Sequence, residues 1–173
     1  MGIEIERKFL LQDDAWRAEV RSSTRMIQGY LVHAAALAQG LARCSVRVRV
    51  AGDRAWLNAK AAMPGIERSE FEVPLPVADA ESMLRQFCDG RVEKLRHLVD
   101  VDGHTFEIDE FMGDNQGLVV AELELSAADA PFPQPDWLGR EVSDMPRYYN
   151  VQLIDHPFRD WSAAERAGEP APC

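Results

Sequence analysis

Apolar and polar residues alternate along most of the chain, with the period of two that is typical of half-buried β-strands. Clear examples are residues 3–6, with the sequence IEIE, and residues 47–50, with the sequence RVRV. Short turn segments such as Gly52-Asp53 and Asp102-Gly103 separate successive runs, which favours antiparallel strands joined by hairpins. The pattern predicts eight strands, over residues 3–10, 25–33, 43–50, 54–61, 67–74, 91–99, 104–111 and 118–125.

Helical patterns lie between and after these strands. Capping residues followed by helical spacing predict helices over residues 13–21, 79–90 and 145–154. Beyond residue 160 the composition changes to Ala, Glu, Gly and Pro, which is typical of a frayed terminus. We therefore predict one domain over residues 1–160 and a flexible tail over residues 161–173.

The composition is that of a globular protein with a strongly acidic balance. The chain has 173 residues, of which 46% are hydrophobic and 28% charged, and its net charge is −10. This balance argues against binding to a nucleic-acid duplex or an anionic membrane, because both need a basic face. Charges begin at Glu4 with no apolar run after them, so no signal peptide or transmembrane helix is expected. These features predict a soluble, cytoplasmic protein.

One face of the predicted sheet is charged on most of its strands, while the opposite face carries residues such as Ile5, Phe106 and Leu123. A solvent-exposed antiparallel sheet shows the same alternation, so exposure to water is the first alternative. The charged face carries Glu4, Glu6, Lys8, Arg47, Arg49, Asn58, Lys60, Glu70, Glu72, Lys94, Arg96, Glu107, Asp109, Glu122 and Glu124.

Two observations favour an enclosed site over a solvated face. Like charges recur at positions i and i+2 on the same strand face, as in Glu4/Glu6 and Arg47/Arg49, where they repel one another unless a multivalent ion of opposite sign binds between them. In addition, the chain has sixteen arginines and three lysines, and all three lysines lie on the charged face. We therefore predict an α+β fold with an antiparallel barrel, a charged lumen and covering helices. Paired carboxylates suit Mg²⁺ or Mn²⁺, and paired cations suit phosphate oxygens.

The order of these motifs resembles that of the CYTH, or triphosphate tunnel metalloenzyme, superfamily. The first motif is Glu4-x-Glu6-x-Lys8, which has the family's ExExK form. The others are Gln28-Gly29-Tyr30-Leu31, Arg47-x-Arg49, Lys60, Glu70-x-Glu72, Glu93-Lys94-x-Arg96, Glu107-x-Asp109, Glu122-x-Glu124 and Arg147-Tyr148-x-Asn150. The resemblance implies an eight-stranded antiparallel β-barrel that forms a tunnel, and metal-dependent chemistry on a small-molecule triphosphate by a monomer or homodimer.

The resemblance also implies roles for individual residues. For the metal, Mg²⁺ or Mn²⁺, it implies Glu4, Glu6, Glu122 and Glu124, with Glu70, Glu72, Glu107 and Asp109 for a second ion or a water molecule. For the phosphates it implies Lys8, Arg47, Arg49, Lys60, Lys94 and Arg96. Catalytic roles are expected for Glu6, Lys94 and Arg147.

Four functions are compatible with such a tunnel. Short chains with this pattern most resemble inorganic triphosphatases, which would split tripolyphosphate into pyrophosphate and phosphate. A thiamine triphosphatase, or a class IV adenylyl cyclase that attacks the α-phosphorus with the ribose 3′-hydroxyl, would use the same tunnel but needs a grip on an organic group. Trp56 and Tyr30 are the aromatic candidates for that grip, although packing is the more common role of such residues. A non-enzymatic polyphosphate- or nucleotide-binding module is disfavoured, because anion binding alone needs few carboxylates.

Overall fold

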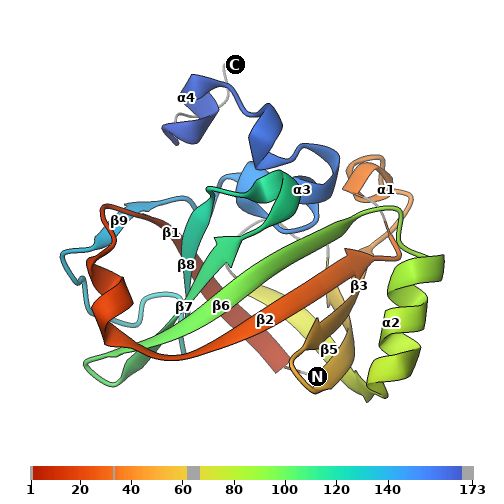
Figure 1. Ribbon diagram of the computed structural model, residues 1–173, viewed down its shortest axis with the longest axis horizontal. Coiled ribbons are helices and arrows are strands. Elements are labelled where there is room, and N and C mark those ends of the chain that lie inside the picture. The colour runs from red at the N-terminus through yellow and green to blue at the C-terminus, as the bar shows by residue number, and fades with distance from the viewer. Residues whose placement is uncertain (1, 33, 62–66, 169–173) are drawn as a thin grey trace.

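The computed structural model describes residues 2–32, 34–61 and 67–168. One sheet dominates it, and short helices lie on its outside and at one end (Figure 1). The strands are β1 (Gly2–Leu11), β2 (Val20–Tyr30), β3 (Cys44–Ala51), β4 (Arg54–Ala61), β5 (Glu67–Leu75), β6 (Arg91–Val101), β7 (His104–Phe111), β8 (Val119–Glu124) and β9 (Leu138–Glu141). The helices are η1 (Ala15–Glu19), α1 (Ala34–Ala38), α2 (Val77–Gln86), η2 (Gly113–Asn115), η3 (Pro146–Tyr148), α3 (Gln152–Asp155), η4 (Phe158–Asp160) and α4 (Ala163–Arg166).

All strand pairs are antiparallel, in the order β5-β4-β3-β2-β6-β7-β8-β1-β9. β1 joins the two ends of this order, because its first residues, Gly2–Ile5, pair with β5 and Glu6–Leu10 pair with β8. The α+β fold with an antiparallel tunnel is therefore confirmed. The eight predicted strands are joined by one short additional strand, β9, and the sheet is curled.

The eight predicted strands are confirmed to within a few residues at their ends, except that β2 begins five residues earlier than predicted. The predicted helix over residues 79–90 is confirmed as α2. The predicted helix over residues 13–21 is only the one-turn η1, since β2 already begins at Val20. The predicted helix over residues 145–154 consists of η3 and α3, because Tyr149 between them has extended backbone angles. The ninth strand, β9, pairs with the last residues of β1.

Apolar side chains pack mainly on the outside of the curled sheet. One cluster contains Phe9, Trp16 and Phe106, and another joins α2 to β3 and β4 through Leu84 and Val48. A third cluster lies at the end of the tunnel, where Phe111 and other strand residues pack against the chain that follows β9. The charged face is therefore the inner face of the sheet. The third cluster covers one end of the tunnel, and we call it the apolar closure.

Residues 161–168 pack in part against the domain. Trp161 is 4% exposed and its ring meets that of Tyr148 edge to face, with 5.1 Å between the ring centroids. Ser162 and Glu165 form a capping box at the start of α4, which stabilises that single turn. Trp161 thus belongs to the domain core, whereas residues 169–173 lie outside the described residues and the flexibility of the tail stays a prediction.

No helix in the described part of the chain is long and apolar enough to cross a membrane. The cytoplasmic location expected from the sequence stays a prediction.

Candidate active site

A cavity of about 470 Å³ opens on the inner face of the sheet. Its walls come from β1, β3, β4, β5 and β8, with Tyr30 from β2, Arg96 from β6 and Glu107 from β7. Its rim comes from α1, Pro146 and residues 149–152. The charged residues that line it are Glu4, Glu6, Lys8, Arg47, Arg49, Lys60, Glu70, Glu72, Arg96, Glu107, Glu122 and Glu124. Twelve of the predicted site residues are therefore brought together around one space.

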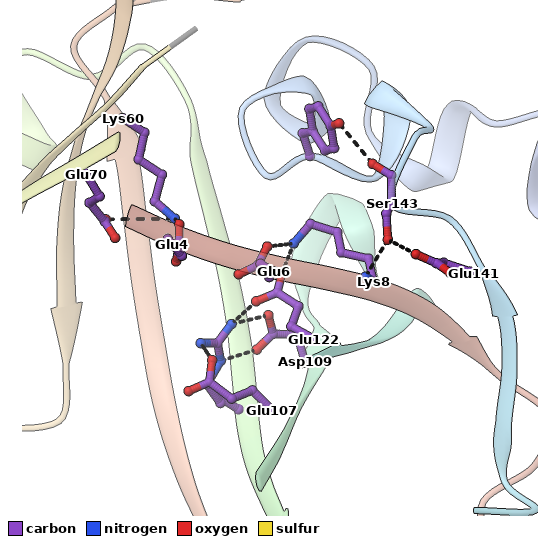
Figure 2. A network of polar contacts seen from close by, with 12 residues as sticks. Glu4, Glu6, Lys8, Lys60, Glu70, Glu107, Asp109, Glu122, Glu141 and Ser143 are labelled. Atoms are coloured by element: carbon purple, nitrogen blue, oxygen red, sulfur yellow. Dashed lines mark hydrogen bonds and ion pairs between the residues drawn. The ribbon is translucent and has the colours of Figure 1, made fainter. Parts of the chain in front are cut away.

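Lys8 lies between two carboxylates in this cavity (Figure 2). Its Nζ is 2.5 Å from Glu6 Oε1 and also donates to Glu122 Oε1. The register explains the meeting, because Lys8 on β1 is the cross-strand partner of Glu122 on β8. Burial and Glu122 both favour the neutral form of Glu6, yet the ammonium groups of Lys8 and Lys60 hold the pKa of Glu6 below its usual value.

Arg96 connects three carboxylates at the floor of the cavity. Its Nη2 is 2.5 Å from Glu122 Oε2, its Nε is 2.7 Å from Asp109 Oδ1, and its Nη1 donates to Glu107. Burial acts to lower the pKa of Arg96, but Asp109 and Glu122 outweigh burial and raise it well above the usual value. The Arg96 guanidinium thus contacts three carboxylates at once, on Glu107, Asp109 and Glu122.

Lys94 and Asp109 lie beneath the cavity and do not line it. Lys94 is 1% and Asp109 0% exposed, and the Lys94 ammonium donates to Asp109 Oδ2. Both residues come from the part of the tunnel next to the apolar closure, where Lys94 pairs in register with Phe111. Burial and the neighbouring charge of Arg96 lower the pKa of Lys94 to about 8. The structure therefore does not bring these two predicted site residues to the surface that a ligand would meet.

We expect the Lys94 ammonium to titrate near pH 8, because burial penalises its charged form. The folded pKa lies below the ordinary value of 10.5, so the unfolded chain binds more protons between these values and the contribution of Lys94 to stability rises with pH there. Lys8 should keep its proton past pH 10.5, since Glu122 and Glu6 raise its pKa. NMR of protein labelled at the lysine Cε carbons measures both groups. A Lys94 signal, assigned through Lys94→Met, that titrates near 10.5 would contradict this expectation.

Two residues before Glu6 on β1, Glu4 pairs with Lys60 of β4, whose Nζ is 2.5 Å from Glu4 Oε2. Burial, the largest influence, raises the pKa of Glu4 although Lys60 opposes it. The Lys60 ammonium is also 3.8 Å from Glu70 Oε1, so this wall alternates in charge, as Figure 2 shows. Burial raises the pKa of Glu107 as well.

Arg47 and Arg49 differ from the other cations that line the cavity, because each has a buried guanidinium donor that is not used by any described residue. The Nε atoms of both guanidinium groups are buried and have no hydrogen-bond partner among the described residues. Among the described residues, the nearest carboxylate oxygen to the Arg47 guanidinium is 3.8 Å away, on Glu70, whereas that of Arg49 is 3.0 Å from Glu72. Burial and the charges of Arg47 and Arg96 lower the pKa of Arg49. Two adjacent, partly desolvated guanidinium groups with unused donors form a favourable site for phosphate oxygens.

The rim of the cavity contains residues that the charge pattern does not predict. Leu37 of α1 and Tyr149, Asn150 and Gln152 all line it. Tyr149 donates from its hydroxyl to the Ser143 carbonyl at 2.9 Å, and the Ser143 Oγ accepts from the Lys8 backbone N–H at 2.9 Å. The rim segment is thus attached to β1 at Lys8 (Figure 2). Tyr30 also lines the cavity, whereas Trp56 does not, and Trp56 lies instead under the Arg54 guanidinium at 4.7 Å.

The structure does not bring Arg147 to the cavity. Its guanidinium carbon is 5.9 Å from the ring centroid of Trp161, on the side of the apolar closure, while its neighbours Pro146 and Tyr149 line the cavity. The expected catalytic role of Arg147 therefore has no support in the geometry.

The carboxylates fit a divalent cation only in part without rearrangement. Among residues 2–32, 34–61 and 67–168, no three Asp, Glu, His or Cys side chains are gathered closely enough to hold a metal ion. However, Glu6 and Glu122 already converge on one positive charge, the Lys8 ammonium. Their oxygens are the hard donors that Mg²⁺ and Mn²⁺ prefer, so the donor set suits such an ion if Lys8 moves aside.

Comparisons with known proteins agree with this geometry. The CYTH domain model matches residues 2–149. The chain is 41% identical over 162 residues to an inorganic triphosphatase of Acetivibrio thermocellus, covering 93% of this chain and 99% of that protein. An inorganic triphosphatase of Nitrosomonas europaea is 32% identical over 153 residues, covering 87% of this chain and 95% of that one.

Two solved structures extend the comparison. The crystal structure of an inorganic triphosphatase superposes with a TM-score of 0.61 at 31% identity, over 89% of this chain and 95% of that one. A Hippeastrum protein, studied as an adenylyl cyclase and described as having a dominant triphosphatase activity, superposes with a TM-score of 0.51 over 73% of this chain and 80% of that chain. At 15% identity this second structure shares the fold alone. The chain belongs to the CYTH domain family.

Proposed function

We propose that this protein is an inorganic triphosphatase, which hydrolyses tripolyphosphate to pyrophosphate and phosphate with the help of Mg²⁺ or Mn²⁺. The observation that carries the proposal is the pair Arg47 and Arg49, with buried guanidinium donors that lack partners among the described residues. They lie in a cavity with carboxylates on its other walls. Two relatives named inorganic triphosphatase, at 41% and 32% identity over most of the chain, support the same substrate.

Arg47 and Arg49 bind the phosphate oxygens first, because each has a buried Nε donor without a partner among the described residues. Lys8 and Lys60 are the second pair of phosphate-binding groups. Each ammonium group is paired with a carboxylate that could also bind a metal ion, Lys8 with Glu6 and Lys60 with Glu4. When the carboxylate binds the metal ion instead, the ammonium group becomes available to a phosphate oxygen. Lys94 does not contact the substrate; it holds the Asp109 carboxylate in place beneath the cavity.

Glu6 and Glu122, with Glu4 beside them, are the residues that would hold the divalent ion. When bound, such an ion neutralises phosphate charge and polarises a phosphoryl oxygen. Glu70, Glu72, Glu107 and Glu124 also line the cavity and are the candidates for a second ion. Asp109 is covered by Lys94 and Arg96, so it would act on a bound ion only indirectly.

In the proposed reaction a water oxygen attacks the terminal phosphorus, and the bond from that phosphorus to the bridging oxygen breaks. Pyrophosphate leaves with the bonding electrons, and the water proton passes to a base. Arg47 and Arg49 hold the substrate in line and stabilise the negative charge of the leaving group. Arg47 is itself buried, which strengthens its interaction with a charged substrate.

A substrate panel tests this function. The purified protein is incubated with Mg²⁺ and, separately, with tripolyphosphate, ATP and thiamine triphosphate. We expect tripolyphosphate to give the highest kcat/KM, with equal amounts of pyrophosphate and phosphate. Cyclic AMP from ATP would instead identify an adenylyl cyclase, and preference for thiamine triphosphate would identify the organic substrate. Binding of all three without any product would identify a binding module.

A further inference from the structure

Asn58 is a neutral side chain in the middle of the charged inner face. It lies on β4 between Trp56 and Lys60 on that face, and its cross-strand partners are Arg47 on β3 and Glu72 on β5. The side chain is 1% exposed and does not line the cavity. A buried amide among charged groups must satisfy its own donors, so its contacts define what it does.

A single atom of Asn58 contacts two carboxylates. Its Nδ2 is 2.9 Å from Glu70 Oε1 and 2.7 Å from Glu72 Oε2. An amide nitrogen has two N–H donors, so each carboxylate receives one. The orientation of the amide follows, because the reverse placement would bring its oxygen against two negative groups. The Oδ1 atom, left on the other side, is buried without a hydrogen-bond partner among the described residues.

The bond to Glu70 has a consequence for Arg47. The Glu70 Oε1 atom that accepts from Asn58 is 3.8 Å from Arg47 Nη2 and 3.8 Å from Lys60 Nζ. A charge-assisted hydrogen bond is about 2.7–2.9 Å long, so Glu70 stops about 1 Å short of both cations. Glu72, in contrast, already contacts Arg49 at 3.0 Å. The restraint exerted by Asn58 therefore matters most at Glu70 and Arg47.

We propose that Asn58 is a positioning residue for anion binding: its amide holds the Glu70 carboxylate away from Arg47, so that the Arg47 charge stays available to a triphosphate. A lysine in this place would hold both glutamates too, but it would add a cation that competes for them. An apolar residue would leave Glu70 free to close the remaining gap and neutralise Arg47. The proposal deepens the proposed function and rests on it for the identity of the anion.

The test is a double-mutant cycle in the affinity for tripolyphosphate, measured by calorimetry in EDTA so that turnover does not enter. Asn58→Leu keeps the side-chain volume nearly constant and removes both donors. We expect it to raise Kd about 10-fold in the wild-type background, the scale on which loss of one well-placed charge contact acts. In the Glu70→Gln background the same substitution should change Kd less than about 2-fold, because no carboxylate remains to close on Arg47.

Asn115→Leu is the matched control for the loss of a buried asparagine. Asn115 is 3% exposed, donates to the Leu153 carbonyl at 3.2 Å and accepts from the Phe158 N–H at 2.8 Å, away from the cavity. This variant should lower the melting temperature and leave Kd unchanged. Asn58→Thr, which keeps one hydroxyl donor and suits a strand, should fall between wild type and Asn58→Leu, and it replaces Asn58→Leu if that protein does not fold.

Three results would overturn the proposal: wild-type Kd in Asn58→Leu, equal weakening in both backgrounds, or no binding of tripolyphosphate by the wild-type protein in EDTA. Turnover with Mg²⁺ is measured separately on the wild-type protein. Binding that follows the expected cycle without turnover would support the role of Asn58 and contradict the proposed triphosphatase. Turnover by the wild-type protein without the expected pattern of Kd values would support the proposed triphosphatase and contradict the role of Asn58.

Discussion

Glu6→Gln should lower kcat for tripolyphosphate at least about 100-fold, the scale on which one preorganised electrostatic group acts. The change is nearly isosteric and removes the negative charge that would hold the metal ion. Stability should change by less than about 1 kcal/mol, because Lys8 keeps Glu122 as its partner and the Glu6 side chain is 23% exposed. Steady-state hydrolysis in Mg²⁺ and thermal unfolding in EDTA, on one preparation, measure the two effects.

Glu110→Gln is the matched control for this experiment. Glu110 lies on the outer face of the same sheet and is also paired with a cation, since both its carboxylate oxygens accept from Arg17 at 3.0 and 3.1 Å. The control should keep wild-type turnover. If Glu6→Gln also folds and turns over like wild type, Glu6 is not needed for metal binding; if it is badly destabilised, Glu6 is primarily a structural partner of Lys8.

Glu122→Gln should have the largest effect on stability, with a loss of about 3 kcal/mol or more in the free energy of unfolding, as for the removal of one partner from a buried ion pair. Glu122 is 5% exposed and compensates two buried cations, Lys8 and Arg96. Gln at this position leaves both cations undercompensated in the floor of the cavity. Turnover should be lost as well, because these cations and Glu122 together form that floor.

The loss caused by Glu122→Gln should depend on pH. Burial acts to raise the pKa of Glu122, but Lys8, Lys94 and Arg96 outweigh burial and hold it well below the ordinary value of 4.5. A carboxyl with a depressed folded pKa contributes stability that is present above its unfolded pKa and is lost as the pH falls toward its folded pKa. Urea unfolding of both proteins at pH 7 and below pH 4 should therefore show a smaller difference in acid. Equal stability of the two proteins at pH 7 would contradict the role given to Glu122.

The alternation of apolar and polar residues predicts most of this fold, because each strand has one inner and one outer face. The ninth strand, Leu138–Glu141, was not predictable in this way, since four residues with a central Gly139 show no alternation. The segment 145–154 has helical composition, but its position over the cavity and the core imposes two short turns instead. Tertiary packing here overrides a local preference.

The same pattern predicts which residues face the tunnel but not which of them meet. Lys8 contacts Glu122 because of the cross-strand register, and no single strand contains that information. The depth along the tunnel is equally hidden, so Lys94 and Asp109 look like cavity residues in sequence although they lie beneath it. Rim residues such as Tyr149 and Gln152 come from irregular chain, where spacing carries no signal.

The most direct test of the central claim follows tripolyphosphate by ³¹P NMR in the presence of the wild-type protein, first with EDTA and then after addition of excess Mg²⁺. The account predicts no product signals in EDTA, and conversion of tripolyphosphate to pyrophosphate and phosphate in equal amounts after Mg²⁺ is added. Undiminished hydrolysis in EDTA, or intact tripolyphosphate in both Mg²⁺ and Mn²⁺, would contradict it.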